Sequence, residues 1–282
     1  MAKRAVLIGV NRYRMPGADL RGCVNDVQNM QSTLVQHYGF AKGDIVTLLD
    51  NGATKKAIES AIRKLVKDGR KGDVLLVHYS GHGSNVPDDN GDEADKRDEI
   101  ICPTDLDWKD PLRDDWLRKT FDGLRAGVSL TVITDSCHSG TITRAVQPPD
   151  APSIARYLPS PWDLVAVESG RKLRGATRGG LRKSARTARK TRDIVPVDLP
   201  EVLITGCRDT QTSADAMING TFNGALTYNL VAAISEAKGS PLTYHALHDA
   251  TIAKLKRGSF DQVPQLEGSR ARFEQPFLSP IE

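Results

Sequence analysis

The sequence predicts an α/β protein in which helices cover both faces of a mainly parallel central β-sheet. Short apolar runs rich in β-branched residues recur along the chain, and segments with apolar residues at helical spacing separate several of them. Strands that alternate with helices favour parallel pairing, because a parallel pair needs a long crossover connection. A chain of 282 residues, of which 39% are hydrophobic, can bury the core of one such domain.

The first part of the chain shows this alternation. Residues 5–10 are apolar or small and are expected to form the first strand. Residues 22–38 place apolar side chains at helical spacing, and residues 45–49 form a short apolar strand. Thr54 can cap the next helix. The expected buried face of that helix is made of Ala57, Ile58, Ala61, Ile62, Leu65 and Val66.

The alternation continues to the end of the chain. Residues 73–79 and 99–102 are expected strands, and residues 114–125 a helix whose first-turn acids suit its macrodipole. Residues 128–134 form another apolar strand. The remaining expected elements are a strand at 201–205 and two helices at 221–237 and 243–256.

Composition argues against several classes of protein. The apolar run near the N-terminus is too short for a signal-peptide core, and no run approaches the ~20 residues of a membrane span. The four cysteines are scattered without metal or redox spacing, which favours a reducing compartment. We therefore expect a cytoplasmic protein that does not contact a membrane. A zinc-binding module is a weak alternative, because no two candidate ligands show finger spacing.

Two reactive motifs follow two of the expected strands. His-Tyr-Ser-Gly-His-Gly occupies residues 78–83, and Asp-Ser-Cys-His-Ser-Gly occupies residues 135–140. The carboxyl ends of parallel strands meet at one edge of the sheet, where such sheets bind ligands. A histidine and a cysteine that meet there supply a nucleophile and its proton carrier. These motifs predict a cysteine peptidase with His82 and Cys137 as its catalytic pair.

The neighbours of this pair have expected roles as well. The N–H of Gly83 can approach a bound carbonyl closely because glycine has no Cβ. With the N–H of Cys137 it would form an oxyanion hole. His138 follows the nucleophile directly and is expected to face away from it, so it is not the predicted base.

The two motifs resemble those of the metacaspases, a family of caspase-like cysteine peptidases. Gly-Cys-Val-Asn-Asp at residues 22–26, the acidic loop and strand at 91–105, and residues 205–215 are also similar to segments of this family. The similarity covers most of the chain outside residues 145–200. It implies a caspase-like fold, a metacaspase of the prokaryotic type, cleavage of protein or peptide substrates after Arg or Lys, and a monomeric enzyme.

An acidic S1 pocket, which receives the P1 side chain before the cleaved bond, follows from this specificity. A buried cation needs a carboxylate partner, because otherwise nothing offsets the free energy that it loses on leaving water. Asp135 lies two residues before Cys137 and therefore on the same face of an extended segment. The resemblance adds Asp26, Cys23 and Ser80 to the pocket. We expect cleavage after Arg or Lys rather than Asp.

A calcium site is a further expectation from the resemblance. Asp98, Asp114 and Asp115 are similar to three of the four metal aspartates of the family, and carboxylates suit this hard cation. Arg144 stands where the fourth should be, which opposes metal binding. The alternative is a solvated acidic surface.

Residues 145–200 form a Pro-rich and Arg/Lys-rich stretch without periodicity. Within it, residues 170–192 hold ten basic residues and no acid. The net charge of the whole chain is +4, so the residues outside this stretch are together net acidic. Three interpretations remain open: a solvated flexible loop, a surface for nucleic acid or other anions that lacks the usual aromatics, and a site of self-cleavage. The candidate cleavage positions are Arg171, Lys172, Arg174, Arg178, Arg182, Lys183, Arg186, Arg189, Lys190 and Arg192.

These features divide the chain into a large-subunit region at 1–144, a linker at 145–200, and a small-subunit region at 201–282 that completes the same domain. Two functions remain open. One is an active endopeptidase that can process its own linker. The other is a catalytically silent binding or signalling module that recognises basic peptides on the same fold.

Overall fold

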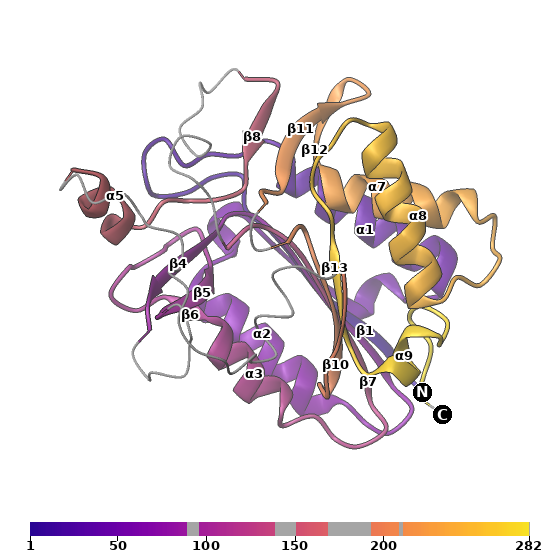
Figure 1. The fold of residues 1–282 in the computed structure, drawn as a ribbon. Coiled ribbons are helices and arrows are strands. Elements are labelled where there is room, and N and C mark those ends of the chain that lie inside the picture. Colours follow the sequence, from indigo (N-terminus) through magenta and orange to yellow (C-terminus); the bar gives the residue numbers. More distant parts are fainter. Residues whose placement is uncertain (89–95, 139–150, 169–192, 209–210, 282) are drawn as a thin grey trace, which may run out of the picture.

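The computed structural model describes residues 1–88, 96–138, 151–168, 193–208 and 211–281. Its centre is a seven-stranded β-sheet in which five neighbouring strands are parallel and the sixth is antiparallel to them (Figure 1). In order across the sheet these strands are β2 (Ile45–Leu49), β1 (Lys3–Gly9), β3 (Val74–Ser80), β7 (Ser129–Asp135), β10 (Glu201–Thr205), β13 (Gln265–Gly268) and β9 (Ile194–Pro196). The predicted α/β class with a mainly parallel central sheet is confirmed.

Helices pack on both faces of this sheet, as Figure 1 shows. Alternate strand residues enter two separate cores: Leu7 and Leu76 pack with the helices of one face, and Val6 and Leu75 with those of the other. One face carries α1 (Cys23–Tyr38), α7 (Ala225–Glu236) and α8 (Tyr244–Arg257). The other carries α2 (Lys55–Asp68) and α3 (Asp114–Phe121). The Thr54 side chain accepts a hydrogen bond from the Ala57 N–H, the cap that the sequence predicts.

Two small antiparallel sheets and four short helices complete the described structure. The sheets are β4 (Gly83–Pro87) with β5 (Arg97–Ile101) and β6 (Leu112–Arg113), and β8 (Ser153–Ala155) with β11 (Ala214–Ile218) and β12 (Thr221–Gly224). The helices are η1 (Lys42–Asp44), η2 (Asp50–Gly52), α5 (Pro161–Glu168) and α9 (Arg270–Phe273). Strands β8 and β9 and helix α5 all lie within the predicted linker.

The helix predicted at 221–237 begins later than expected. Residues 221–224 are strand β12, which pairs with β11 across a two-residue turn. Asn219 and Gly220 both have positive φ in that turn, as a tight hairpin requires, so their sequence is a hairpin signal that the helical pattern concealed. The predicted helix at 114–125 is also shorter than expected and ends at Phe121.

Candidate active site

The two reactive motifs leave the sheet side by side. Strands β3 and β7 are parallel neighbours, and Ser80 at the end of one is in register with Asp135 at the end of the other. His82 and Cys137 each follow two residues later, so both lie at the same carboxyl edge. The sequence predicts the shared carboxyl edge from the two apolar runs, and the structure adds that the two strands are neighbours.

A segment of the predicted linker crosses this edge in extended form. Strand β8 pairs with β11, where Ala155 is opposite Ala214. The Arg156 N–H then donates to the Ser213 carbonyl at 2.9 Å. Beyond Arg156, the Leu158 N–H donates to the Gly83 carbonyl at 3.0 Å. The backbone of residues 153–158 therefore spans the site from β11 to the loop after His82.

The carbonyl group of Arg156 lies between the two predicted oxyanion donors. Its oxygen accepts from the Gly83 N–H at 3.0 Å and from the Cys137 N–H at 3.2 Å. A Cβ added at Gly83 would overlap the Cys137 carbonyl group, so the close approach of these two loops requires glycine. Two convergent backbone N–H groups on one carbonyl oxygen are the geometry that stabilises a developing oxyanion.

The side chain of Arg156 fills a buried acidic pocket. The guanidinium is fully buried, and its Nη2 lies 2.8 Å from Asp26 and 3.1 Å from Asp215. Nη1 lies 3.4 Å from the Asp135 carboxylate and donates to Ser80 Oγ at 2.8 Å. Three carboxylates thus face one cation in a site that excludes water.

Backbone amides hold these carboxylates in place. The Gly224 N–H donates to Asp26 and the Thr227 N–H donates to Asp135, both at the N-terminal end of α7. The Gly22 N–H donates to Asp215 just before α1 begins. Helix N-termini favour negative charge, so these amides stabilise the negative charge of the carboxylates. Burial nevertheless raises the pKa of Asp26, and Arg156 opposes that shift.

The imidazole of His82 is held by a backbone carbonyl. Its Nε2 lies 2.9 Å from the Ala18 oxygen, which can only accept, so Nε2 carries the proton of the neutral ring. Its Nδ1 is buried and has no hydrogen-bond partner among the described residues. Burial lowers the pKa of His82 to about 4. Nδ1 is therefore an unprotonated nitrogen that can accept a proton, and the Ala18 carbonyl orients the ring.

The thiol of Cys137 is fully buried beside the small-subunit region. Its Sγ accepts a hydrogen bond from the Ser213 N–H and lies 3.4 Å from the Sγ of Cys207. Because Nδ1 of His82 is unpartnered among the described residues, the thiol and imidazole are not hydrogen-bonded to each other in this state. Catalytic pairs often tighten only when the reacting complex forms.

Comparison with known proteins identifies the family. The sequence model described as "Metacaspase, peptidase C14 domain" matches residues 3–145. Metacaspase-1B of Neosartorya fischeri is 37% identical over 95% of this chain and 69% of its own length. Metacaspase-1 of Coccidioides immitis is 36% identical over 95% of this chain and 61% of its own length. This chain belongs to the metacaspase family, a family of cysteine peptidases.

A solved structure supports the same fold. A protein from Geobacter sulfurreducens superposes with a TM-score of 0.69 at 28% sequence identity, and the match covers 100% of both chains. The curated relatives are longer than this metacaspase, which spans only 61% of the Coccidioides immitis protein.

The structure brings all four S1 residues of the sequence prediction to one place. Asp26, Asp135 and Ser80 contact the guanidinium of Arg156 directly. Cys23 is buried at the start of α1; burial raises the pKa of its thiol, and the nearby charge of Arg156 opposes the shift.

Two residues of the acidic pocket could not be assigned from the sequence. Asp215 lies in a segment that resembles the family, but only the pairing of β11 with β8 shows that it faces the pocket. Arg156 lies in the predicted linker outside the expected cleavage region. The expected cleavage positions at 171–192 lie outside the described residues.

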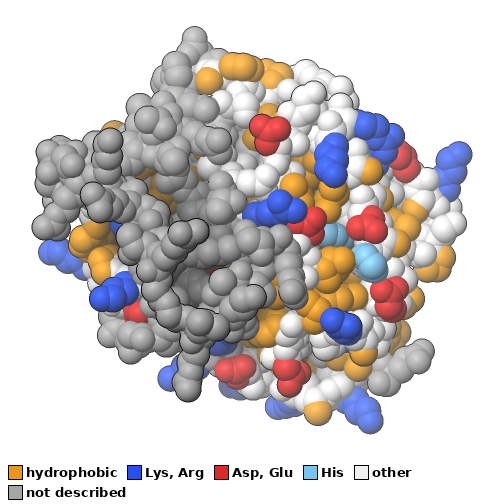
Figure 2. All heavy atoms as spheres, in the orientation of Figure 1, with side chains coloured by type: hydrophobic (Ala, Val, Ile, Leu, Met, Phe, Trp, Pro, Cys, Tyr) orange, Lys and Arg blue, Asp and Glu red, His pale blue; other side chains and the backbone are white. Residues whose placement is uncertain are grey.

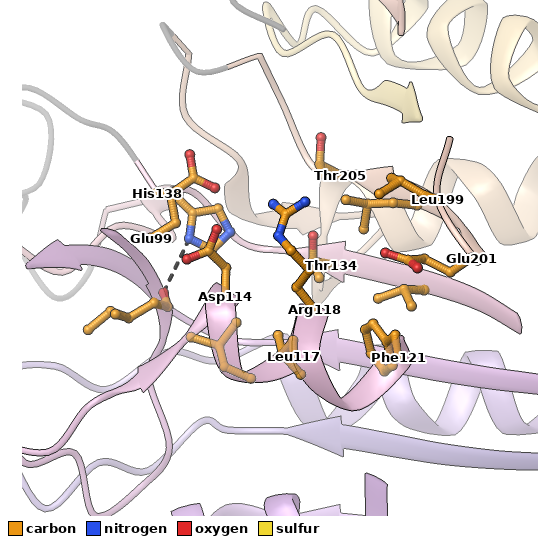
Figure 3. Close-up of a pocket in the computed structure, with 14 residues that line it drawn as sticks. Glu99, Asp114, Leu117, Arg118, Phe121, Thr134, His138, Leu199, Glu201 and Thr205 are labelled. Carbon is orange, nitrogen blue, oxygen red and sulfur yellow. Dashed lines mark hydrogen bonds between the residues drawn. The ribbon is translucent and has the colours of Figure 1, made fainter. Parts of the chain in front are cut away.

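The three predicted metal aspartates lie beside the site, on β5 and at the start of α3. Asp98 is ion-paired with Arg113, and burial raises the pKa of both Asp98 and Asp114. Figure 3 shows the Asp114 carboxylate beside the ring of His138, whose Nδ1 contacts the Ile100 carbonyl at 3.2 Å. Within the described ranges, no group of three acidic, histidine or cysteine side chains can hold a metal ion. The residues present do not fit a calcium ion, and Arg144 lies outside the described part.

A calcium requirement remains a prediction that a chelator tests. Since Asp98 is ion-paired with Arg113, and the described residues contain no group of three side chains that could hold a metal ion, we expect EGTA to change peptide turnover by less than twofold. Addition of excess magnesium with EGTA controls for ionic strength. A tenfold or greater loss that calcium alone restores would instead support the site expected from the resemblance.

Proposed function

We propose that this metacaspase is an endopeptidase that cleaves after Arg or Lys with Cys137 as nucleophile and His82 as proton carrier. The observation that carries the proposal is the placement of Arg156. Its side chain lies among three carboxylates while its carbonyl oxygen lies on the N–H groups of Gly83 and Cys137. A bound substrate would use the same pocket and the same two donors.

The proposed reaction has two steps. Nδ1 of His82 takes the thiol proton as Cys137 Sγ attacks the carbonyl carbon of the P1 residue, and the oxyanion forms on the Gly83 and Cys137 N–H groups. The imidazolium then protonates the leaving amine, and an acyl-enzyme remains. Water, activated by the same imidazole, hydrolyses the thioester and regenerates the thiol.

A lysine can occupy the pocket as well as an arginine. The three N–H donors of an ammonium group can reach these carboxylates, although the guanidinium offers five donors in a planar fork that binds carboxylates bidentately. An aspartate at P1 would place a fourth negative charge in a buried acidic site, so it should be rejected.

Peptide turnover tests this specificity. We expect kcat/KM for an arginine-P1 fluorogenic peptide to exceed that for an aspartate-P1 peptide at least 100-fold, because each buried charged hydrogen bond contributes about 1.5–3 kcal/mol. Asp135→Ala should abolish the arginine activity. Equal turnover of both peptides would contradict the pocket assignment.

Further properties belong to the same proposal. Substrates would be proteins or peptides with Arg or Lys at P1, and we propose a cytoplasmic monomer that processes its own linker. No helix of the described residues is long and apolar enough to cross a membrane. On the face that Figure 2 shows, described acidic and basic side chains are interspersed, which does not favour nucleic-acid binding there.

The alternative is a silent module that binds basic tails in the acidic pocket. The observation that favours it is that the buried thiol accepts a hydrogen bond from Ser213 and is not hydrogen-bonded to Nδ1 of His82. Binding of the arginine peptide without turnover would support this alternative.

A further inference from the structure

Residues 153–158 lie in the site as a bound substrate would. On the acyl side, β8 forms antiparallel backbone pairs with β11, and the Arg156 N–H donates to Ser213. On the leaving-group side, the Leu158 N–H donates to the Gly83 carbonyl, and Ser84 Oγ donates to the Leu158 carbonyl at 2.6 Å. The peptide backbone is thus held on both sides of the Arg156–Tyr157 bond.

Core packing alone does not explain this placement. A buried structural arginine needs carboxylate partners for its guanidinium, and Arg156 has them. It does not need its own carbonyl oxygen to accept from the N–H of the proposed nucleophile and from that of Gly83. Side chain and peptide group are recognised together, which is what a protease does with the residue before the cleaved bond.

We propose that the Arg156–Tyr157 bond is a self-cleavage site of this chain, and that the uncut segment occludes the active site until it is cut. This inference rests on the proposed endopeptidase function and specifies its regulation. Because Arg156 is fully buried in the pocket, another substrate cannot place its P1 side chain there while the segment remains.

Water is the only other reactant that the proposed self-cleavage needs. Sγ of Cys137 leaves Ser213, forms a bond to the Arg156 carbonyl carbon, and the bond from that carbon to the Tyr157 nitrogen breaks. His82 transfers the thiol proton to the departing nitrogen, which becomes a new N-terminal amine. Hydrolysis of the thioester then leaves a carboxylate on Arg156.

Cleavage should open the pocket. The new carboxylate gives a negative charge to the residue whose side chain lies in this acidic pocket, and like charges in a buried site repel one another. The Tyr157 side stays anchored, since its hydroxyl donates to Asp163 at 2.8 Å and accepts from Asn85 at 3.2 Å. The acyl side is held by the three residue pairs of β8 with β11 and by the ion pairs of Arg156, which the new carboxylate would weaken.

The wild-type chain tests this inference without any substitution. Freshly purified protein is incubated over time, and intact mass and N-terminal sequencing identify each new terminus. We expect fragments 1–156 and 157–282, and turnover of an arginine-P1 peptide that rises in step with the Tyr157 terminus. Because the bond already lies in its own site, the cleavage rate should be first order and independent of protein concentration over a 100-fold range. Cys137→Ala should remain intact.

Two substitutions of Arg156 sharpen the test. Arg156→Lys keeps a cation for the three carboxylates, so the cut after residue 156 should persist. Arg156→Gln should block this cut while the purified variant still hydrolyses the arginine-P1 peptide, without the lag that precedes turnover in the wild type. If Arg156→Gln does not fold, the wild-type and Arg156→Lys measurements still decide the outcome.

The outcomes separate this inference from the proposed function. Peptide turnover by a chain cut only within 171–192, with the Arg156–Tyr157 bond intact, would overturn the inference and leave the function standing. The inference is also overturned if the wild-type chain stays uncut and inactive while the Arg156→Gln variant hydrolyses the peptide. Residues 153–158 would then be an inhibitory pseudosubstrate that is never cut. Absence of both self-cleavage and peptide turnover would overturn both.

Discussion

Replacement of Cys137 by Ala should abolish hydrolysis of the arginine-P1 peptide, and His82→Ala should lower kcat at least 1,000-fold. The first change removes the only atom proposed to attack. The second removes a base and acid whose contribution is typically about 10²–10⁴-fold. The assay is fluorogenic peptide turnover on each purified variant, with circular dichroism to show that the fold is retained.

The lowered pKa of His82 affects the two proposed proton transfers in opposite directions: it makes the ring a weaker base toward the thiol and a stronger acid toward the leaving amine. Burial favours the neutral ring, so at pH 7 Nδ1 is free to take the thiol proton. Once protonated, an imidazole whose pKa is about 4 is a stronger acid than a free histidine and gives its proton readily to the leaving amine. The Ala18 carbonyl holds the other nitrogen during both transfers.

His138 provides the matched control for this prediction. It is adjacent to the nucleophile in sequence, but its ring contacts the Ile100 carbonyl beside α3 (Figure 3). We expect His138→Ala to retain activity within about tenfold of the wild type. If His138→Ala loses as much activity as His82→Ala, the assignment of the base is wrong.

The position of His82 and Cys137 at one carboxyl edge of the sheet could be predicted from the sequence, because it depends on local patterns. Two apolar strands predict that both motifs lie at one carboxyl edge of a parallel sheet, and the structure shows that the strands are neighbours whose ends His82 and Cys137 follow by equal distances. The alternation of an extended chain placed Asp135 on the face of the pocket. The resemblance to metacaspases supplied Asp26, which lies far away in the sequence.

The occupant of the pocket could not be predicted in the same way. Strand β8 has only three residues, too few for a periodic pattern, and it follows a proline-rich stretch that is typical of a loop. Its place is decided by long-range contacts with β11 and with Gly83, which local sequence does not encode. Residues 221–224 were expected to be helical for a different, local reason: the helical pattern that follows them concealed the turn at Asn219 and Gly220, and pairing with β11 makes them a strand.

Asp26→Asn should lower kcat/KM for the arginine-P1 peptide by about 100-fold, chiefly through KM. Asp26 makes the shortest carboxylate contact to the guanidinium, at 2.8 Å, and the loss of one buried charged hydrogen bond costs about 1.5–3 kcal/mol. An asparagine fits this position, because its oxygen can still accept from Gly224 and its amide can donate to Ser80.

A surface aspartate offers the control for the same chemical change. Asp68 is half-exposed and forms an ion pair with Lys64 at 2.7 Å on α2. Such surface pairs contribute about 0–1 kcal/mol, so Asp68→Asn should leave both kcat and KM unchanged. A comparable loss of activity in both variants would show that stability rather than pocket charge is being measured.

The pH dependence of KM distinguishes a pocket charge from a packing role. Burial raises the pKa of Asp26 above that of an exposed aspartate, so this carboxylate takes up a proton as the pH falls through the mildly acidic range. The protonated group no longer attracts a guanidinium, and KM for the arginine peptide should therefore rise in the wild type as the pH falls. In Asp26→Asn the titrating group is gone, and KM should vary much less over the same range. A KM profile identical in the two proteins would mean that Asp26 acts only through the packing of α1 against α7.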